Sequence, residues 1–177
     1  MRRFLDRLYL ASGAVGAVFV LLICVLMIAQ SVLREFNVRT GAVNDVVAWC
    51  CAAAAFLAMP HAFKHGDFVR VTLLLEHLRD GQRRAFEVGA LAIGSTAVAY
   101  LAWSAVSFTL ESWRFNDIAQ GLMPIPLWIP QLSFALGSVL LWVALVDELV
   151  IVMRGGRPTY VVAVEERHAH GDFSSEV

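Results

Sequence analysis

The chain has 177 residues, of which 59% are hydrophobic and 16% are charged, and its formal net charge at pH 7 is -1. Its mean hydropathy is +0.67, whereas about a quarter of the residues of a soluble domain are charged. These values argue against an ordinary soluble domain, and we expect no nucleic-acid partner.

The apolar residues gather in four blocks. Each block reaches the roughly 20 residues that cross about 30 Å of hydrocarbon. The first is too long for a signal peptide, so we expect a retained signal anchor. The sequence predicts an all-α membrane protein with a four-helix transmembrane domain over residues 1–153 and a flexible cytoplasmic tail over 154–177. The predicted spans are 8–33, 43–63, 88–110 and 127–153.

The basic residues predict the orientation. Eleven of the 14 Lys and Arg residues precede the first block, lie between the second and third, or follow the fourth. Cytoplasmic loops carry an excess of Lys and Arg, so both termini are predicted to be cytoplasmic.

The stretch "KHGDFVRV" (residues 64–71) interrupts the apolar pattern. Gly66 allows a sharp turn after the second span. From Phe68 the apolar residues recur with helical spacing among charged ones, which predicts a short amphipathic helix over residues 68–79 at the cytoplasmic membrane interface. A solvated hairpin loop is the alternative.

Ionisable residues are expected near the membrane interfaces, within reach of water or headgroups. Asp147 and Glu148 lie near the inner end of the fourth block, and Arg34 and Glu111 are expected at one outer level, where they could pair. A solute path or catalytic site at depth would need polar groups there, so we expect no enzyme, catalytic residue, cofactor or metal. The other charges expected at the interfaces are Lys64, Arg83 and Arg84.

The blocks offer packing surfaces instead. Small residues four apart let helices approach closely, as in the pairs Gly13/Ala17, Ala48/Ala52 and Ala54/Ala58. Asp45 opens the second block and is followed by Trp49. In "PIPLWIPQ", Pro126 and Trp128 form a stiff, anchored entry to the fourth block.

The order of these motifs resembles the small membrane subunit (DctQ type) of tripartite ATP-independent periplasmic (TRAP) transporters, over about residues 5–153. The positions that fit its pattern are Asp45, Trp49, Gly66, Val69, Arg70, Val71, Pro126, Trp128 and Gly137. Phe68 stands where His is usual, and Thr72 where Asp is usual.

The resemblance implies an accessory small permease subunit of an ion-gradient-driven organic acid transporter in the bacterial inner membrane. It implies as partners a large multi-span permease subunit, which the chain would scaffold, and a periplasmic solute-binding protein, besides membrane lipids. The residues that fit the pattern become candidates for partner contacts or structural motifs.

Two alternatives stay open on the residues alone. One is the membrane anchor of a redox complex, although His61 and His65 both lie at the inner end of the second span and no other span has a histidine. The other is a stand-alone four-span membrane assembly protein.

Overall fold

The computed structural model describes the backbone of residues 2–38, 40–67, 80–156 and 158–169, and the side chains of residues 5–38, 40–67, 84–156 and 158–164. The predicted interfacial helix over 68–79, with Val69, Arg70 and Val71, lies outside the described residues. The side chain of Arg83 also lies outside them.

The described chain is built from helices. They are α1 (Arg2–Glu35), α2 (Gly41–His65), α4 (Asp80–Phe115), α5 (Trp128–Met153) and α6 (Thr159–Ala169). Within the described ranges, four helices are long and apolar enough to cross a membrane, which confirms the four predicted spans. The third is longer than predicted, because α4 begins at Asp80 rather than at Val88.

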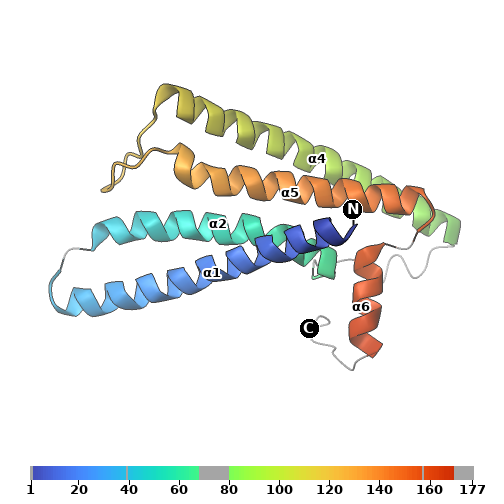
Figure 1. Cartoon of the computed structure of the whole chain (residues 1–177), viewed down its shortest axis with the longest axis horizontal. Helices are drawn as coiled ribbons and strands as arrows, with labels where there is room; N and C mark the ends of the chain where they lie inside the picture. Colours follow the sequence, from blue (N-terminus) through green and yellow to red (C-terminus); the bar gives the residue numbers. More distant parts are fainter. Residues whose placement is uncertain (1, 39, 68–79, 157, 170–177) are drawn as a thin grey trace.

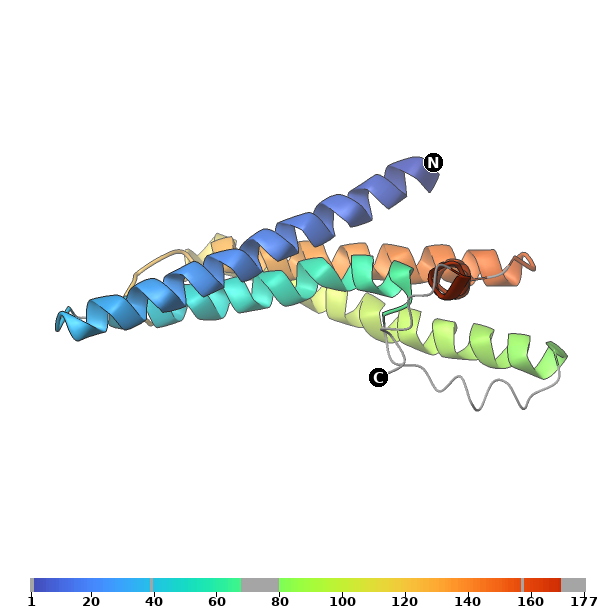
Figure 2. The same cartoon turned by 90° about the horizontal axis from the view of Figure 1, so that it is seen from below.

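The four long helices lie side by side in one layer, in the order α1, α2, α5, α4 (Figures 1 and 2). The layer has two ends. The terminal end holds the starts of α1 and α4, the ends of α2 and α5, and α6. The loop end holds the short α1–α2 connection and the longer loop over residues 116–127. A single layer leaves broad apolar surfaces exposed, as lipid contact requires.

Small residues set the spacing between α1 and α2. Gly16 lies so close to α2 that an added Cβ would be 3.2 Å from the Ala54 carbonyl oxygen and from the Ala58 nitrogen. The Ser12 hydroxyl donates a hydrogen bond of 2.5 Å to the Leu57 carbonyl oxygen. The contact therefore uses Gly16 and Ala54, whereas Ala17, which the sequence pattern paired with Gly13, is exposed.

The junction between the two hairpins is the contact of α2 with α5. Gly137 of α5 is buried, and a Cβ there would be 2.5 Å from the carbonyl carbon and oxygen of Phe56. Beside it, the rings of Phe56 and Phe134 meet edge to face, with centroids 4.3 Å apart and planes at 85°. The glycine admits a close backbone approach that no other residue allows.

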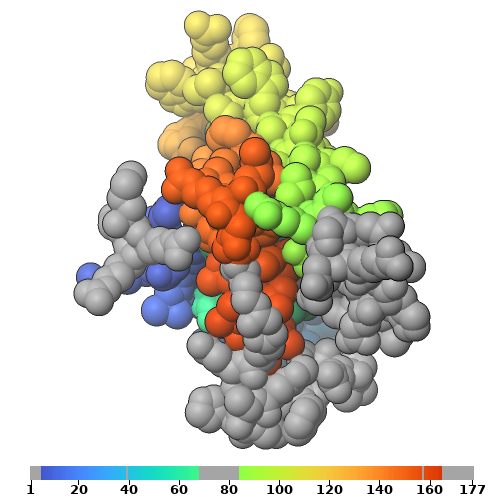
Figure 3. Space-filling view, turned by 90° about the vertical axis from the view of Figure 1, so that its right-hand side faces the viewer, coloured from blue at the N-terminus to red at the C-terminus, as the bar shows by residue number. Residues whose placement is uncertain are grey.

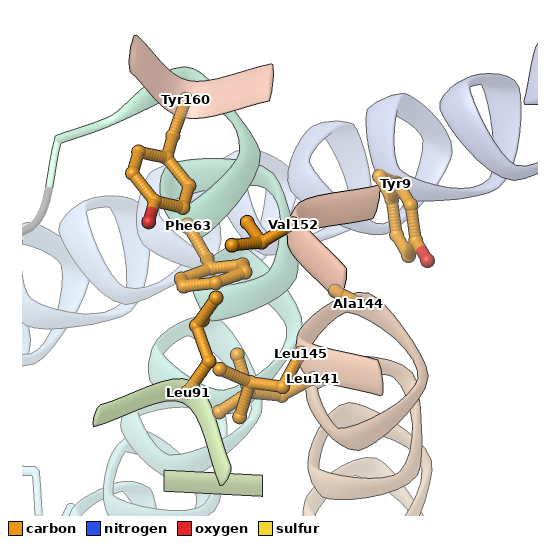
Figure 4. Packing of buried hydrophobic residues seen from close by; sticks show 8 residues of the cluster. All are labelled: Tyr9, Phe63, Leu91, Leu141, Ala144, Leu145, Val152 and Tyr160. Carbon is orange, nitrogen blue, oxygen red and sulfur yellow. The ribbon is translucent and has the colours of Figure 1, made fainter. Parts of the chain in front are cut away.

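At the terminal end, one apolar cluster joins all five helices (Figure 4). Phe63 of α2 lies at its centre, with Val152 and Leu145 of α5 on one side and Tyr160 of α6 above it. The cluster consists of Tyr9, Phe63, Leu91, Leu141, Ala144, Leu145, Val152 and Tyr160.

The segment after α5 differs from the expected flexible tail, because residues Thr159–Ala169 form α6. Tyr160 is buried in the cluster, 5.9 Å from Phe63 between ring centroids. The sequence signal was weak because the helix has only 11 residues, and short helices depend on tertiary packing for stability.

We expect Gly137→Ala to destabilise the protein by about 1–3 kcal/mol, because its methyl group must separate α2 from α5. The matched control is Gly89→Ala, where an added Cβ meets nothing within 4 Å. Unfolding in mixed micelles, followed by circular dichroism, measures both variants. Equal stability of the two would contradict a close α2–α5 contact at Gly137.

Candidate assembly site

A buried group of charged side chains holds α2, α5 and α6 together at the terminal end. The Lys64 Nζ lies 2.6 Å from the Asp147 Oδ2 and 2.8 Å from the Glu148 Oε1. Lys64 is 9% exposed and Glu148 is fully buried. We call Lys64, Asp147, Glu148 and Thr159 the Lys64 cluster. Pairing offsets the large cost of removing these charges from water.

Glu148 is the centre of this cluster, because both of its oxygens have partners. Oε1 accepts hydrogen bonds from Lys64 and from the Thr159 hydroxyl. Oε2 accepts a hydrogen bond of 3.0 Å from the Thr159 backbone N–H. The carboxylate therefore binds the first residue of α6, where the helix dipole favours negative charge. This explains why α6 begins at Thr159.

Two glycines shape the chain around the cluster. Gly66 ends α2 at a φ of 79°, and Gly155 ends the turn after α5 at a φ of 83°. In both turns the glycine N–H bonds the carbonyl three residues back, and the next N–H bonds the carbonyl five back, which is the Schellman pattern. The turn at Gly155 reverses the chain, so that Thr159 reaches Glu148.

Gly66 is also a contact point for α6. An added Cβ would be 2.8 Å from the Tyr160 carbonyl oxygen and 2.7 Å from the Val164 Cγ2. At Gly155 the nearest atom to an added Cβ is the Arg84 guanidinium nitrogen at 3.6 Å, an ordinary contact. Figure 3 faces this end of the molecule and shows α6 and the end of α5 beside the start of α4.

The first helix reaches the cluster through Tyr9. Its side chain is 2% exposed, and the Lys64 Nζ lies 5.5 Å from its ring centroid. At this distance a cation is attracted to the face of an aromatic ring. Tyr9 therefore covers the ion pairs from the side of α1, and four helices meet at the cluster.

A second set of polar contacts ties the loop end. The Asp45 Oδ2 accepts a hydrogen bond of 3.1 Å from the Leu122 backbone N–H. An added Cβ at the neighbouring Gly121 would be 3.0 Å from the Asp45 Cγ. The Gln30 amide donates a 2.9 Å bond to the Asn44 side chain. Asp45 thus connects the start of α2 to the loop between α4 and α5.

The remaining predicted residues lie apart from these contacts. Trp49 and Trp128 are half-buried, and Pro126 lies in the loop opposite Ile118. Arg34 and Glu111 are exposed, and no ion pair joins these two described residues. Arg84 donates a 3.0 Å bond to the Met153 carbonyl oxygen, which links the start of α4 to the end of α5.

Sequence reasoning missed the acidic half of the Lys64 cluster. Glu148 was expected within reach of water or headgroups, but its burial shows that the charge is neutralised inside the protein. A signal was present. α2 and α5 end at the same side of the layer, so a lysine ending one helix and adjacent acids ending the other lie at one level.

The chemistry of the cluster is structural. Each charged group already contacts an opposite charge, and Glu148 has no free oxygen for a ligand. Among the residues with described side chains, no three His, Cys, Asp or Glu side chains gather as a metal site would require. The arrangement fixes helices relative to one another.

One comparison identifies a relationship for most of the chain. The family model described as "Tripartite ATP-independent periplasmic transporters, DctQ component" matches residues 23–155. No curated protein matches the chain. The matched range contains α2, α4, α5 and the last part of α1, with Lys64, Asp147 and Glu148, but ends before Thr159.

We expect Lys64→Met to destabilise the protein by about 3–5 kcal/mol, because it leaves two carboxylates near each other without a counter-charge. The triple variant Lys64→Met, Asp147→Asn, Glu148→Gln removes all three charges and should recover a large part of this loss. Unfolding in mixed micelles measures both. If Lys64→Met were as stable as the triple variant or more stable, that result would contradict the ion pairs of Lys64 with Asp147 and Glu148.

A second prediction concerns the contact of Gly66 with α6. Gly66→Ala and Gly155→Ala both place a side chain at positive φ, which costs about 1–2 kcal/mol. Gly66→Ala should cost about 1–3 kcal/mol more, because its methyl group also displaces α6. Thermal unfolding gives the difference, and proteolysis after α5 should be faster in Gly66→Ala. Equal effects at both positions would contradict the docking of α6 on Gly66.

Proposed function

Since the chain belongs to the DctQ component family of tripartite ATP-independent periplasmic transporters, we propose that it is the accessory small permease subunit of an ion-gradient-driven organic acid transporter. In this proposal a large multi-span subunit moves the solute, and a periplasmic binding protein delivers it. The present chain stabilises the large subunit within the membrane.

The observation that carries the scaffold role is the absence of charge from the middle of the four described spans. α1 has no charged residue from Leu8 to Leu33, and α4 has none between Glu87 and Glu111. The buried charges lie at the terminal end and are paired with one another. A carboxylate moving through these helices would meet no cationic partner at depth.

The architecture supports a role beside a partner. A single layer of helices leaves large apolar side chains exposed on α1, α4 and α5. Such a layer widens a neighbouring membrane protein. Its helices are fixed relative to one another by polar bonds at both ends, as a rigid support requires.

The orientation proposed from the basic residues is consistent with the layer. Eleven of the 14 basic residues precede the first apolar block, lie between the second and third, or follow the fourth in the sequence, and the described helix ends at these points lie at the terminal end. We therefore propose that the terminal end, with the Lys64 cluster, is cytoplasmic in the inner membrane. The loop end, with Asp45 and Leu122, then faces the periplasm, where the binding protein docks.

The experiment is reconstitution into liposomes under a sodium gradient. We expect a tagged copy of the chain to co-purify with a large multi-span permease subunit from its host membranes. Liposomes with both subunits and the cognate binding protein should accumulate the solute of that binding protein. Liposomes with the chain alone should show no uptake above protein-free liposomes. Uptake by the chain alone, or full uptake without it, would overturn the proposal.

A further inference from the structure

We propose that one face of α4 is the surface that binds the large permease subunit within the bilayer. We call this surface the α4 face and define it by Thr96, Tyr100, Trp103 and Ser107, which are four, three and four residues apart and thus lie along one side of the helix. The inference rests on the proposed function and specifies where the partner binds.

The two aromatic residues of the α4 face lie at the wrong depth for a lipid anchor. Tyr100 is at the middle of the uncharged stretch between Glu87 and Glu111. Trp103 is one turn further on, about 5 Å along the helix axis. Tyr and Trp that contact lipid collect at the membrane–water interfaces, where their polar atoms reach water. Both residues here lie far from either interface.

Their polar atoms have no partner within the chain. Tyr100 and Trp103 are each 75% exposed. Neither the Tyr100 hydroxyl nor the Trp103 indole N–H makes a hydrogen bond to any described residue. Hydrocarbon offers no acceptor, so these groups are costly if lipid surrounds them. A protein surface with acceptors at this depth removes that cost.

The opposite edge of the layer gives the contrast. The large exposed side chains of α1 between Leu10 and Val32 are aliphatic, apart from Met27. These side chains carry no hydrogen-bonding group that needs a partner, so contact with lipid leaves no polar atom of theirs without one. The two edges therefore differ in chemistry, and α4 is the one with unmet hydrogen bonds.

The occupant is a membrane-spanning protein surface with carbonyl or hydroxyl oxygens near mid-bilayer. Thr96 needs no acceptor from the partner, because its hydroxyl already donates a hydrogen bond of 2.8 Å to the Ala92 carbonyl oxygen. Like Tyr100 and Trp103, Ser107 makes no hydrogen bond to a described residue, so the partner has to supply acceptors for these three side chains. Apolar neighbours such as Ile93, which is 75% exposed, add area for packing.

Photo-crosslinking in native membranes tests this assignment. A benzophenone amino acid replaces Tyr100 or Trp103, and the matched control replaces Leu21 on α1, which is 67% exposed. Each variant is expressed with the large permease and the binding protein, and its co-purification is checked before illumination. We expect a product of the chain with the large permease from positions 100 and 103, at least tenfold stronger than from 21.

The outcomes separate this inference from the proposed function. If the chain does not co-purify with the permease, the proposed function fails. If it co-purifies but crosslinks from position 21 and not from 100 or 103, the α4 assignment alone is overturned. A product with the mass of two copies of the chain from position 100 also overturns it, because the face would then form a homodimer.

A smaller change tests the hydrogen bond itself. Tyr100→Phe removes one oxygen atom and leaves the ring, so we expect the complex to dissociate about threefold more readily on dilution in detergent, as for other hydrogen bonds between membrane helices. Leu21→Ala should leave dissociation unchanged. Equal dissociation of Tyr100→Phe and the unmodified chain would contradict an acceptor opposite Tyr100.

Discussion

The ion pairs between Lys64 and the carboxylates of Asp147 and Glu148 are the interaction on which the rest of the structure depends. A charge in this place is unfavourable unless its partner lies within a few ångströms. A slip of α2 against α5 by one helical turn, about 5.4 Å, would separate the pairs. Through Glu148 the same contact also determines where α6 begins. The cluster thus fixes the depth of the second hairpin relative to the first.

Apolar packing alone would not fix that depth. Glycine and alanine set how close α1 lies to α2 and α2 to α5, and the rings of Phe56 and Phe134 add packing between α2 and α5. Directional bonds restrict sliding at three places: Ser12 with Leu57 within the α1–α2 contact, Asp45 with Leu122 at the loop end, and the Lys64 cluster at the terminal end. Between the two hairpins, spacing and register are therefore determined by different residues, Gly137 and the Lys64 cluster.

The four spans could be predicted from the sequence, because the length and uniformity of an apolar block are local properties. The role of Gly66 could be expected from its position between a span and a charged segment. The partners of Lys64 were missed, since they are 83 and 84 residues away and depend on which helices are neighbours. The helix α6 was missed for a related reason, because its first turn is stabilised by Glu148 of α5. Contacts between distant segments required the three-dimensional arrangement.

The distance along the chain between Lys64 and its partners also has a consequence for biosynthesis. At about 5–20 residues per second, the ribosome needs roughly 4–17 seconds to add the residues between them. During that interval the nascent first hairpin carries an unpaired lysine, which keeps its end of α2 among headgroups or water. Only after α5 is inserted can the Lys64 ammonium group move from the headgroups or water to its buried place beside Asp147 and Glu148. Membrane integration of the first hairpin and its final burial are thus separate events in time.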